Sequence, residues 1–256
     1  MIGVKAKSIV LKAKQTLKFM FTRIKTLAAL LLVTFSVILI SCDTEDPGPL
    51  QEGRKEFPIV DFDRLEMGSA FNIEVEYANI FSIQAKGDRR NINDLEVYKS
   101  GNTLVIEFDD NEDRHHDTYI KISMPRLDAV NFSGGSVSKI RGFESDDDLD
   151  LYLSGASVSQ LDSDYRELNL VVSGASSLLM HGSGDELHAE ISGASTLKAF
   201  DYPVREATAN VSGASEGKIT VTDELNVTAG GASSILYRGN PTVTSNTSGA
   251  STVQKD

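Results

Sequence analysis

The chain has 256 residues, of which 25 are lysine or arginine and 37 are aspartate or glutamate, giving a formal net charge of −12. Such an acidic chain repels phosphate backbones, which excludes nucleic acid as an expected partner. It contains a single cysteine, so a disulfide framework is also excluded.

The first 41 residues contain seven lysines and arginines and no acidic residue, and they include an apolar run from Leu27 to Ile40. A charged segment leading into an apolar run too short for a membrane span is typical of a secretory signal peptide. The run ends in Leu39-Ile40-Ser41-Cys42, which resembles the lipobox of bacterial lipoproteins. We predict that residues 1–41 are a signal peptide and that Cys42 is lipidated, which leaves a mature chain of net charge −19.

Residues 42–58 show no hydrophobic periodicity and are rich in acidic residues, proline and glycine. This composition predicts a flexible tether behind the lipidated cysteine. The acidic cluster after Cys42 is similar to the surface-export signal of some Gram-negative lipoproteins, but it fits a plain solvated linker equally well. We expect a lipid-anchored protein of the outer membrane, exposed at the cell surface or facing the periplasm. The lipid is then its only contact with the membrane, because the acidic chain is repelled by an anionic surface.

From residue 59 to residue 126 the sequence alternates between apolar and polar residues without a repeated motif. Ile73, Val75 and Tyr77 mark one strand, and the segments 95–97 and 104–108 flank a hairpin-like turn at Ser100-Gly101-Asn102. We predict that these strands build the N-terminal end of the column that follows and cover its first coil as a cap, because the end coil of a solenoid otherwise exposes its core.

Residues 127–256 repeat the motif Ser-Gly-Ala-Ser or a close variant seven times, at intervals of 18–21 residues. The residues one and three positions before the motif are mostly apolar, which indicates a strand with one buried side. The glycine and the final serine occur in all seven copies. We expect a positive φ or a close approach of coils at the glycine and a hydrogen-bonded ladder at the serine. We also expect the alanine to point inward, so that Ala194 packs between Ala175 and Ala214.

A repeat of about twenty residues without a helical pattern cannot form a βαβ unit, but stacked copies can bury their apolar residues against one another. We therefore predict an all-β fold for residues 59–256. Its architecture is a single-stranded right-handed parallel β-helix, or β-solenoid, with an N-terminal β cap region and one coil per repeat.

The chain resembles a known family of Gram-negative envelope proteins, the auto-transporter adhesins with a head GIN domain. The resemblance rests on the lipoprotein signal, the lead-in Phe62-Asp63-Arg64-Leu65, the Met124-Pro125-x-Leu127 segment and the serial Ser-Gly-Ala-Ser coils. It covers about residues 59–256. It implies a β-helical fold at the cell surface and does not imply a particular ligand.

Residues two and four positions before each motif are expected to point outward and to align in two rows when the coils stack. We select six of them as a candidate binding face for a glycan or a protein: Tyr152, Asn169, Glu190, Asn210, Asn226 and Asn246. The alternative is a solvated sheet face without a ligand. The sequence does not predict the oligomeric state.

We predict no catalytic residue, metal or cofactor, and a non-enzymatic function as an adhesin or scaffold. The histidine pair His115-His116 lies in a polar loop without a known metal-binding spacing, and Gly213–Gly217 matches G-x-S-x-G only as part of the fifth repeat. A polysaccharide lyase or hydrolase on a β-helix is the alternative. It requires a cleft with convergent carboxylates or basic groups, and the nearly constant repeat length leaves little room for one.

Overall fold

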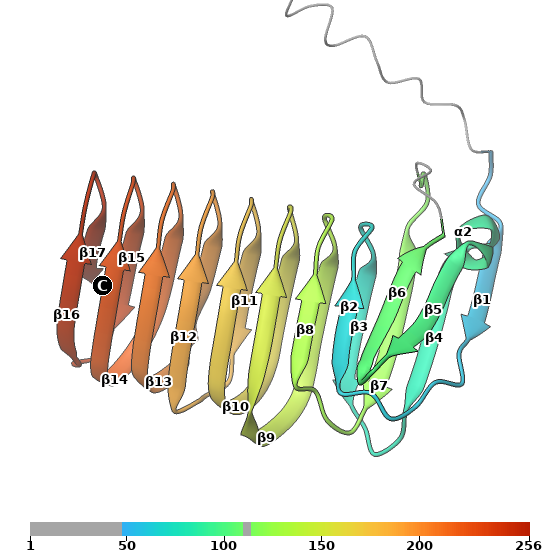
Figure 1. Ribbon diagram of the computed structural model, residues 1–256, viewed down its shortest axis with the longest axis horizontal. Coiled ribbons are helices and arrows are strands. Elements are labelled where there is room, and N and C mark those ends of the chain that lie inside the picture. The colour runs from blue at the N-terminus through green and yellow to red at the C-terminus, as the bar shows by residue number, and fades with distance from the viewer. Residues whose placement is uncertain (1–47, 110–113) are drawn as a thin grey trace, which may run out of the picture. The chain divides into compact units, whose positions relative to one another are not determined.

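Alternation of buried and exposed residues along the repeats builds a column with two sheet faces (Figure 1). The computed structural model describes residues 48–109 and 114–256, so Cys42 and the predicted signal peptide lie outside the described residues. Neighbouring coils pair in parallel, which confirms the predicted parallel β-solenoid. We call the strands that precede the Ser-Gly-Ala-Ser turns face A and the strands that follow them face B.

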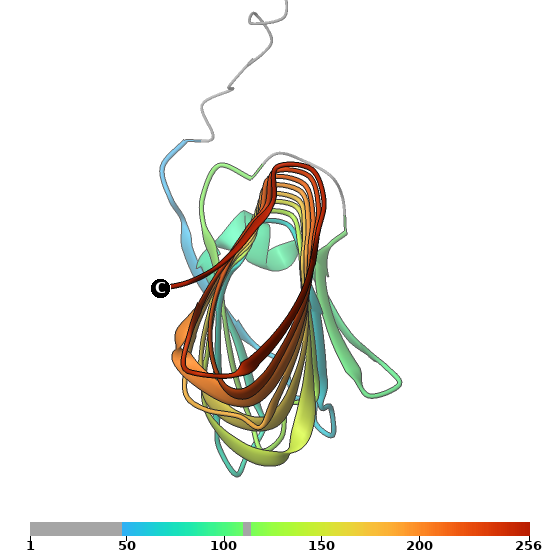
Figure 2. The same ribbon diagram turned by 90° about the vertical axis from the view of Figure 1, so that its left-hand side faces the viewer.

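In the repeat region, four long strands run through the bend opposite the turn and contribute to both faces. Residues 137–141 of β9, for example, lie on face B and residues 150–153 lie on face A. The strands are β8 (Ala129–Phe132), β9 (Val137–Leu153), β10 (Val158–Val172), β11 (Ser177–His181), β12 (Glu186–Ile191), β13 (Thr196–Val211), β14 (Glu216–Ala229), β15 (Ser234–Arg238), β16 (Thr242–Thr247) and β17 (Thr252–Lys255). Seen end on, the coils superpose as a flattened loop with a narrow turn at one end (Figure 2).

The turns follow the prediction for glycine and serine but not for alanine. Gly174 has a φ of +75°, and a Cβ placed there would lie 2.4 Å from the carbonyl oxygen of Gly155 in the preceding coil. Ser157 is buried; its hydroxyl donates to the Ser154 carbonyl (2.8 Å), and its N–H donates to the Ser176 hydroxyl (3.2 Å). The inward alanine was a wrong prediction: Ala194 is exposed, because the positive φ at the glycine reverses the chain one residue earlier than alternation suggests.

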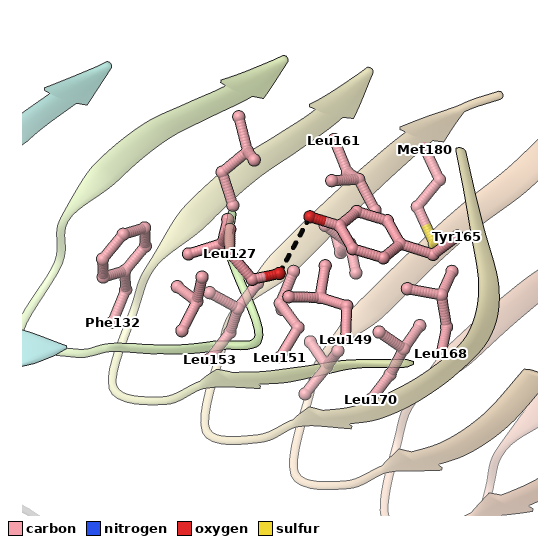
Figure 3. Close-up of a cluster of buried hydrophobic side chains, with 14 of the residues drawn as sticks. Leu127, Phe132, Leu149, Leu151, Leu153, Leu161, Tyr165, Leu168, Leu170 and Met180 are labelled. Carbon is pink, nitrogen blue, oxygen red and sulfur yellow. Dashed lines mark hydrogen bonds between the residues drawn. The ribbon is translucent and has the colours of Figure 1, made fainter. Parts of the chain in front are cut away.

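The core between the faces holds stacked aliphatic side chains and, at the bend, aromatic ones (Figure 3). Tyr165 and Tyr202 are fully buried at this bend. The Tyr165 hydroxyl donates to the carbonyl of Leu127 (3.1 Å), and the Tyr202 hydroxyl accepts from the N–H of Tyr165 (3.2 Å). Burial raises the pKa of both phenols far above the ordinary value, so they stay neutral hydrogen-bonding members of the core.

The N-terminal region begins the solenoid as well as capping it. Two coils precede the motif repeats, because β2 pairs in parallel with both β6 and β8, and β3 with both β7 and β9. The turn between β2 and β3 is Gly68–Phe71, where Phe71 takes the place of the buried serine and Ser69 and Ala70 adopt positive φ. The strands are β2 (Arg64–Met67), β3 (Asn72–Tyr77), β6 (Thr103–Phe108) and β7 (Thr118–Met124). Coils therefore begin before residue 127, the boundary predicted from the motif.

The remaining elements close this end of the column. They are β1 (Glu52–Glu56), β4 (Ser82–Asp88), β5 (Leu95–Ser100) and helix α2 (Arg89–Asn93). The predicted hairpin at Gly101 is confirmed, since β5 and β6 pair antiparallel. Residues 52–56, which were assigned to the tether, instead form β1, an antiparallel partner of β4. The strand escaped prediction because it is polar and almost wholly exposed, so it shows no apolar alternation.

Helix α2 is held by a buried carboxylate. The side chain of Asp88 caps the helix by accepting from the N–H of Arg90 (2.9 Å), and it also accepts from the N–H of Gln51 (3.0 Å) and the Arg90 guanidinium (2.8 Å). These donors, the guanidinium first, hold the pKa of Asp88 well below its ordinary value. Among the residues that the structure describes, no helix is long and apolar enough to span a membrane.

Candidate functional site

The six residues predicted to form a binding face all lie on face A. Strand pairing aligns Tyr152, Glu190, Asn210 and Asn246 in one row across the coils, and Asn169 and Asn226 in the neighbouring row. Alternation explains this placement, since the residues between them are buried in the core. The two predicted rows are therefore present in the structure.

Only part of this face is free to meet a ligand. Asn169 donates to the carboxylate of Asp150 (3.2 Å), and Asn226 donates to that of Glu224 (2.7 Å). A hollow of about 250 Å³ is lined by Tyr152, Asn169, His188, Glu190, Thr208 and Asn210. Asn226 and Asn246 do not line this hollow. The hollow presents the aromatic ring of Tyr152, which is 43% exposed, beside amide and carboxylate groups. Such a surface can hydrogen-bond a polar ligand.

Face A also carries a row of carboxylates that the sequence analysis did not identify. Strand pairing aligns the acidic residues six positions before five of the motifs, namely Asp148, Glu167, Glu186, Glu206 and Glu224. Basic side chains lie beside several of these carboxylates: Arg166 pairs with Asp148 and lies 3.6 Å from Glu167, and Arg205 approaches Glu206 at 3.6 Å. Aligning the repeats six positions before the motif would have revealed this row.

The histidines and the acidic loops do not assemble a metal site within the described residues. His116 Nε2 lies 3.9 Å from Asp88 Oδ2, and His188 lies 3.7 Å from Glu186. In residues 48–109 and 114–256, no group of three or more histidine, cysteine or acidic side chains is placed to hold a metal ion. Residues 110–113 of the polar loop beside His115 lie outside the described residues.

The G-x-S-x-G match is part of a turn. Ser215 is buried, and its hydroxyl accepts from the N–H of Ser195 (3.4 Å). A nucleophilic serine requires an exposed hydroxyl on a strand-to-helix elbow. Ser215 instead sits between two strands, β13 and β14, and has a structural role.

Taken together, the stacked parallel coils and their outward polar rows define a β-solenoid with exposed sheet faces. The sequence profile of a family described as "Putative auto-transporter adhesin, head GIN domain" matches residues 61–241, and the chain belongs to this family. No curated protein sequence matches the chain.

Solved structures share the fold. A "putative adhesin" from Bacteroides fragilis is 19% identical, with a TM-score of 0.72, and the match covers 80% of this chain and 97% of that chain. A "putative adhesin" from Parabacteroides merdae (19%, TM-score 0.65) and a "putative lipid binding protein" from Parabacteroides distasonis (20%, TM-score 0.63) each cover 80% of this chain and 96% of their own. At these identities the likeness establishes the fold alone.

Proposed function

We propose that the chain is a non-enzymatic adhesin or binding scaffold of the cell envelope, anchored through lipidated Cys42 and presenting face A to a glycan or protein. The observation that carries this proposal is the pair of outward rows on face A, which form a mostly polar surface across successive coils. Membership of a family described as adhesins supports a binding role.

The anchor is inferred from the sequence. The basic segment, the apolar run and the Leu-Ile-Ser-Cys ending support a lipoprotein of the outer membrane, and the acidic residues after Cys42 support export to the cell surface. A single acyl chain gives only marginal membrane binding, so stable anchoring requires more than one. We expect wild-type chain to fractionate with the outer membrane and Cys42→Ala to be released or left uncleaved. Mature-sized Cys42→Ala in the outer membrane would refute the anchor.

The binding role is tested by cell adhesion. Cells that display the wild-type chain should adhere to glycan- or matrix-coated surfaces, and Tyr152→Ala/Asn210→Ala/Asn246→Ala should lose most of this adhesion. Thr196→Ala/Gln254→Ala on face B is the control, because it removes a half-buried and an exposed polar group from the opposite sheet face. Equal adhesion by all three chains would remove face A from consideration, and no adhesion by the wild type would overturn the adhesin proposal.

The alternative, a polysaccharide lyase or hydrolase, is less well supported. The family description names an adhesin. On face A, moreover, the hollow measures only about 250 Å³, and the carboxylates of the acidic row lie along the sheet without converging on one point.

A further inference from the structure

A second hollow lies on face B, opposite the rows discussed so far. It has a volume of about 730 Å³ and crosses β4, β7, β3, β9 and β10 to reach β11. None of the six residues chosen from the sequence lines it. Face B therefore carries a second candidate surface, at the end of the column where the cap meets the coils.

The hollow arises from the lengths of the outward side chains. Its floor is a row aligned by strand pairing, Tyr119–Asn72–Val137–Val158, which crosses four adjacent strands, or about 14 Å. The next row holds longer side chains, including Lys121, Lys139 and Gln160, which form a wall. Tyr119, Val137 and Val158 are 50%, 50% and 49% exposed, so the floor offers apolar patches to solvent.

Charge separates this hollow from face A. Three lysines, Lys86, Lys121 and Lys139, line it together with one carboxylate, Glu74. Lys121 forms ion pairs with Glu76 (3.0 Å) and Glu74 (3.7 Å), and Lys139 lies 3.4 Å from Asp162. Lys86 has no ion-pair partner among the described residues, so its charge is available to a ligand. The acidic row lies on the opposite sheet. Packed sheets are about 10 Å apart, which exceeds the Debye length of about 8 Å at physiological ionic strength, so that row is largely screened from a ligand at the hollow.

We propose that the face B hollow binds an anionic polysaccharide, whose sugar rings lie on the floor and whose carboxylate or sulfate groups meet the lysines. Sites of this kind combine apolar patches with a few placed polar groups. Tyr119 and the two valines supply the patches, and Asn72, Gln84 and Gln160 supply amides at their margins.

The floor favours a sugar chain over an acyl chain. The amide of Asn72 stands between Tyr119 and Val137 in the floor row, so an acyl chain would cross a polar group. Sugar rings present small apolar faces separated by polar edges, and this matches the interrupted pattern. The surface is also an open sheet face, where an acyl chain would stay half in contact with water, at a cost proportional to its exposed area.

The test is affinity electrophoresis and titration of the full-length chain with three polymers: polygalacturonate for carboxylate, heparin for sulfate and dextran as the neutral probe. We expect binding to at least one polyanion, none to dextran, and weaker binding as salt is raised. Lys86→Glu/Lys139→Glu should lower the affinity about tenfold or more, and Tyr119→Ser should also lower it. Lys99→Glu/Lys255→Glu makes the same charge change away from the hollow and should leave the affinity within about twofold.

Three results would overturn the inference: equal binding of dextran and polyanions, equal affinity of the wild type and Lys86→Glu/Lys139→Glu, or binding only to phosphatidylglycerol vesicles. Circular dichroism of each variant checks that its strands are retained. The inference is separate from the role proposed for face A, because Tyr152→Ala/Asn210→Ala/Asn246→Ala should keep full polyanion binding. Loss of polyanion binding in that triple variant would place the site on face A and refute the face B assignment.

Discussion

The two ends of the described chain are stabilised in different ways. In the motif repeats, residues 129–256, one glycine turn and one parallel pairing recur in every coil. At the N-terminal end, residues 49–128, antiparallel strands and a short helix meet around individual side chains such as Asp88. The comparison teaches that a repeated contact makes each coil depend on its neighbour, whereas the cap combines its share of the apolar core with specific hydrogen bonds that do not recur.

The largest expected effect is in the column. Gly174→Ala combines a left-handed backbone, which costs roughly 1–2 kcal/mol, with a Cβ 2.4 Å from the Gly155 carbonyl oxygen, and overpacking of this kind costs roughly 1–3 kcal/mol. We expect the free energy of unfolding to fall by about 2–5 kcal/mol, measured by urea denaturation.

Gly101→Ala in the β5–β6 hairpin is the matched control. Gly101 also has a positive φ, +61°, but a Cβ there would meet no atom within 4 Å. Gly101→Ala should therefore lower the free energy of unfolding only by the cost of the left-handed backbone, roughly 1–2 kcal/mol. Equal losses for the two variants would show that contact between coils does not contribute.

The cap should respond most strongly at Asp88. Asp88→Ala leaves the part-buried N–H groups of Gln51 and Arg90 without their acceptor, and loss of an N-cap acceptor costs roughly 0.5–2 kcal/mol. Asp88→Asn keeps the size of the side chain and removes the charge. Asp201→Asn, at an exposed aspartate, is the control. If Asp88→Asn lowered the free energy of unfolding no more than Asp201→Asn does, the role of the buried carboxylate would be contradicted.

The same carboxylate predicts a pH dependence. Because the pKa of Asp88 is lowered in the folded state, its contribution is present in full well above pH 4 and declines as pH falls below the unfolded value of about 3.9. The difference in unfolding free energy between the wild type and Asp88→Asn should therefore be constant near neutral pH and shrink towards pH 3. A difference that grows on acidification would refute the assignment.

Comparing the regions also shows what the sequence could predict. The motif repeats specified the parallel coils, the glycine turns and the outward rows of face A, because each feature recurs at a fixed spacing. The strands of the N-terminal region were placed at the end of the column, but complete coils were not identified there, because the β2–β3 turn, Gly68–Phe71, lacks the motif. Strand β1 escaped because an exposed edge strand needs no apolar residues.

The hollow on face B could not be predicted for a different reason. Its floor combines Tyr119, Asn72 and Val137, which come from strands that neighbour one another in space but not in sequence. Between β3 and β9 the chain leaves the column to form part of the cap and then returns. The floor row can therefore be recognised only once the strand pairing is known.

A smaller effect is expected at the buried serines of the turns. The Ser157 hydroxyl donates to the Ser154 carbonyl, so Ser157→Ala should lower the unfolding free energy by about 0.5–1.5 kcal/mol. The buried Ser195 hydroxyl has no hydrogen-bond partner within residues 48–109 and 114–256, and Ser195→Ala should change stability by less than about 0.5 kcal/mol. The difference between the denaturation midpoints of the two variants measures the contribution of the Ser157 hydrogen bond. Equal midpoints would show that this hydrogen bond does not stabilise the fold.

The smallest effect should be at the alanine that the sequence placed in the core. Ala194 is exposed, and its N–H donates to the Gly174 carbonyl (2.8 Å), a bond that a leucine backbone can still make. Ala194→Leu should therefore change the unfolding free energy by no more than about 0.5 kcal/mol. The neighbouring Ser195→Leu is the matched control, because its side chain would enter the packed interior and cost roughly 1–3 kcal/mol. If Ala194→Leu proved the more costly of the two, the turn would have to present its alanine inward, as the sequence alone suggested.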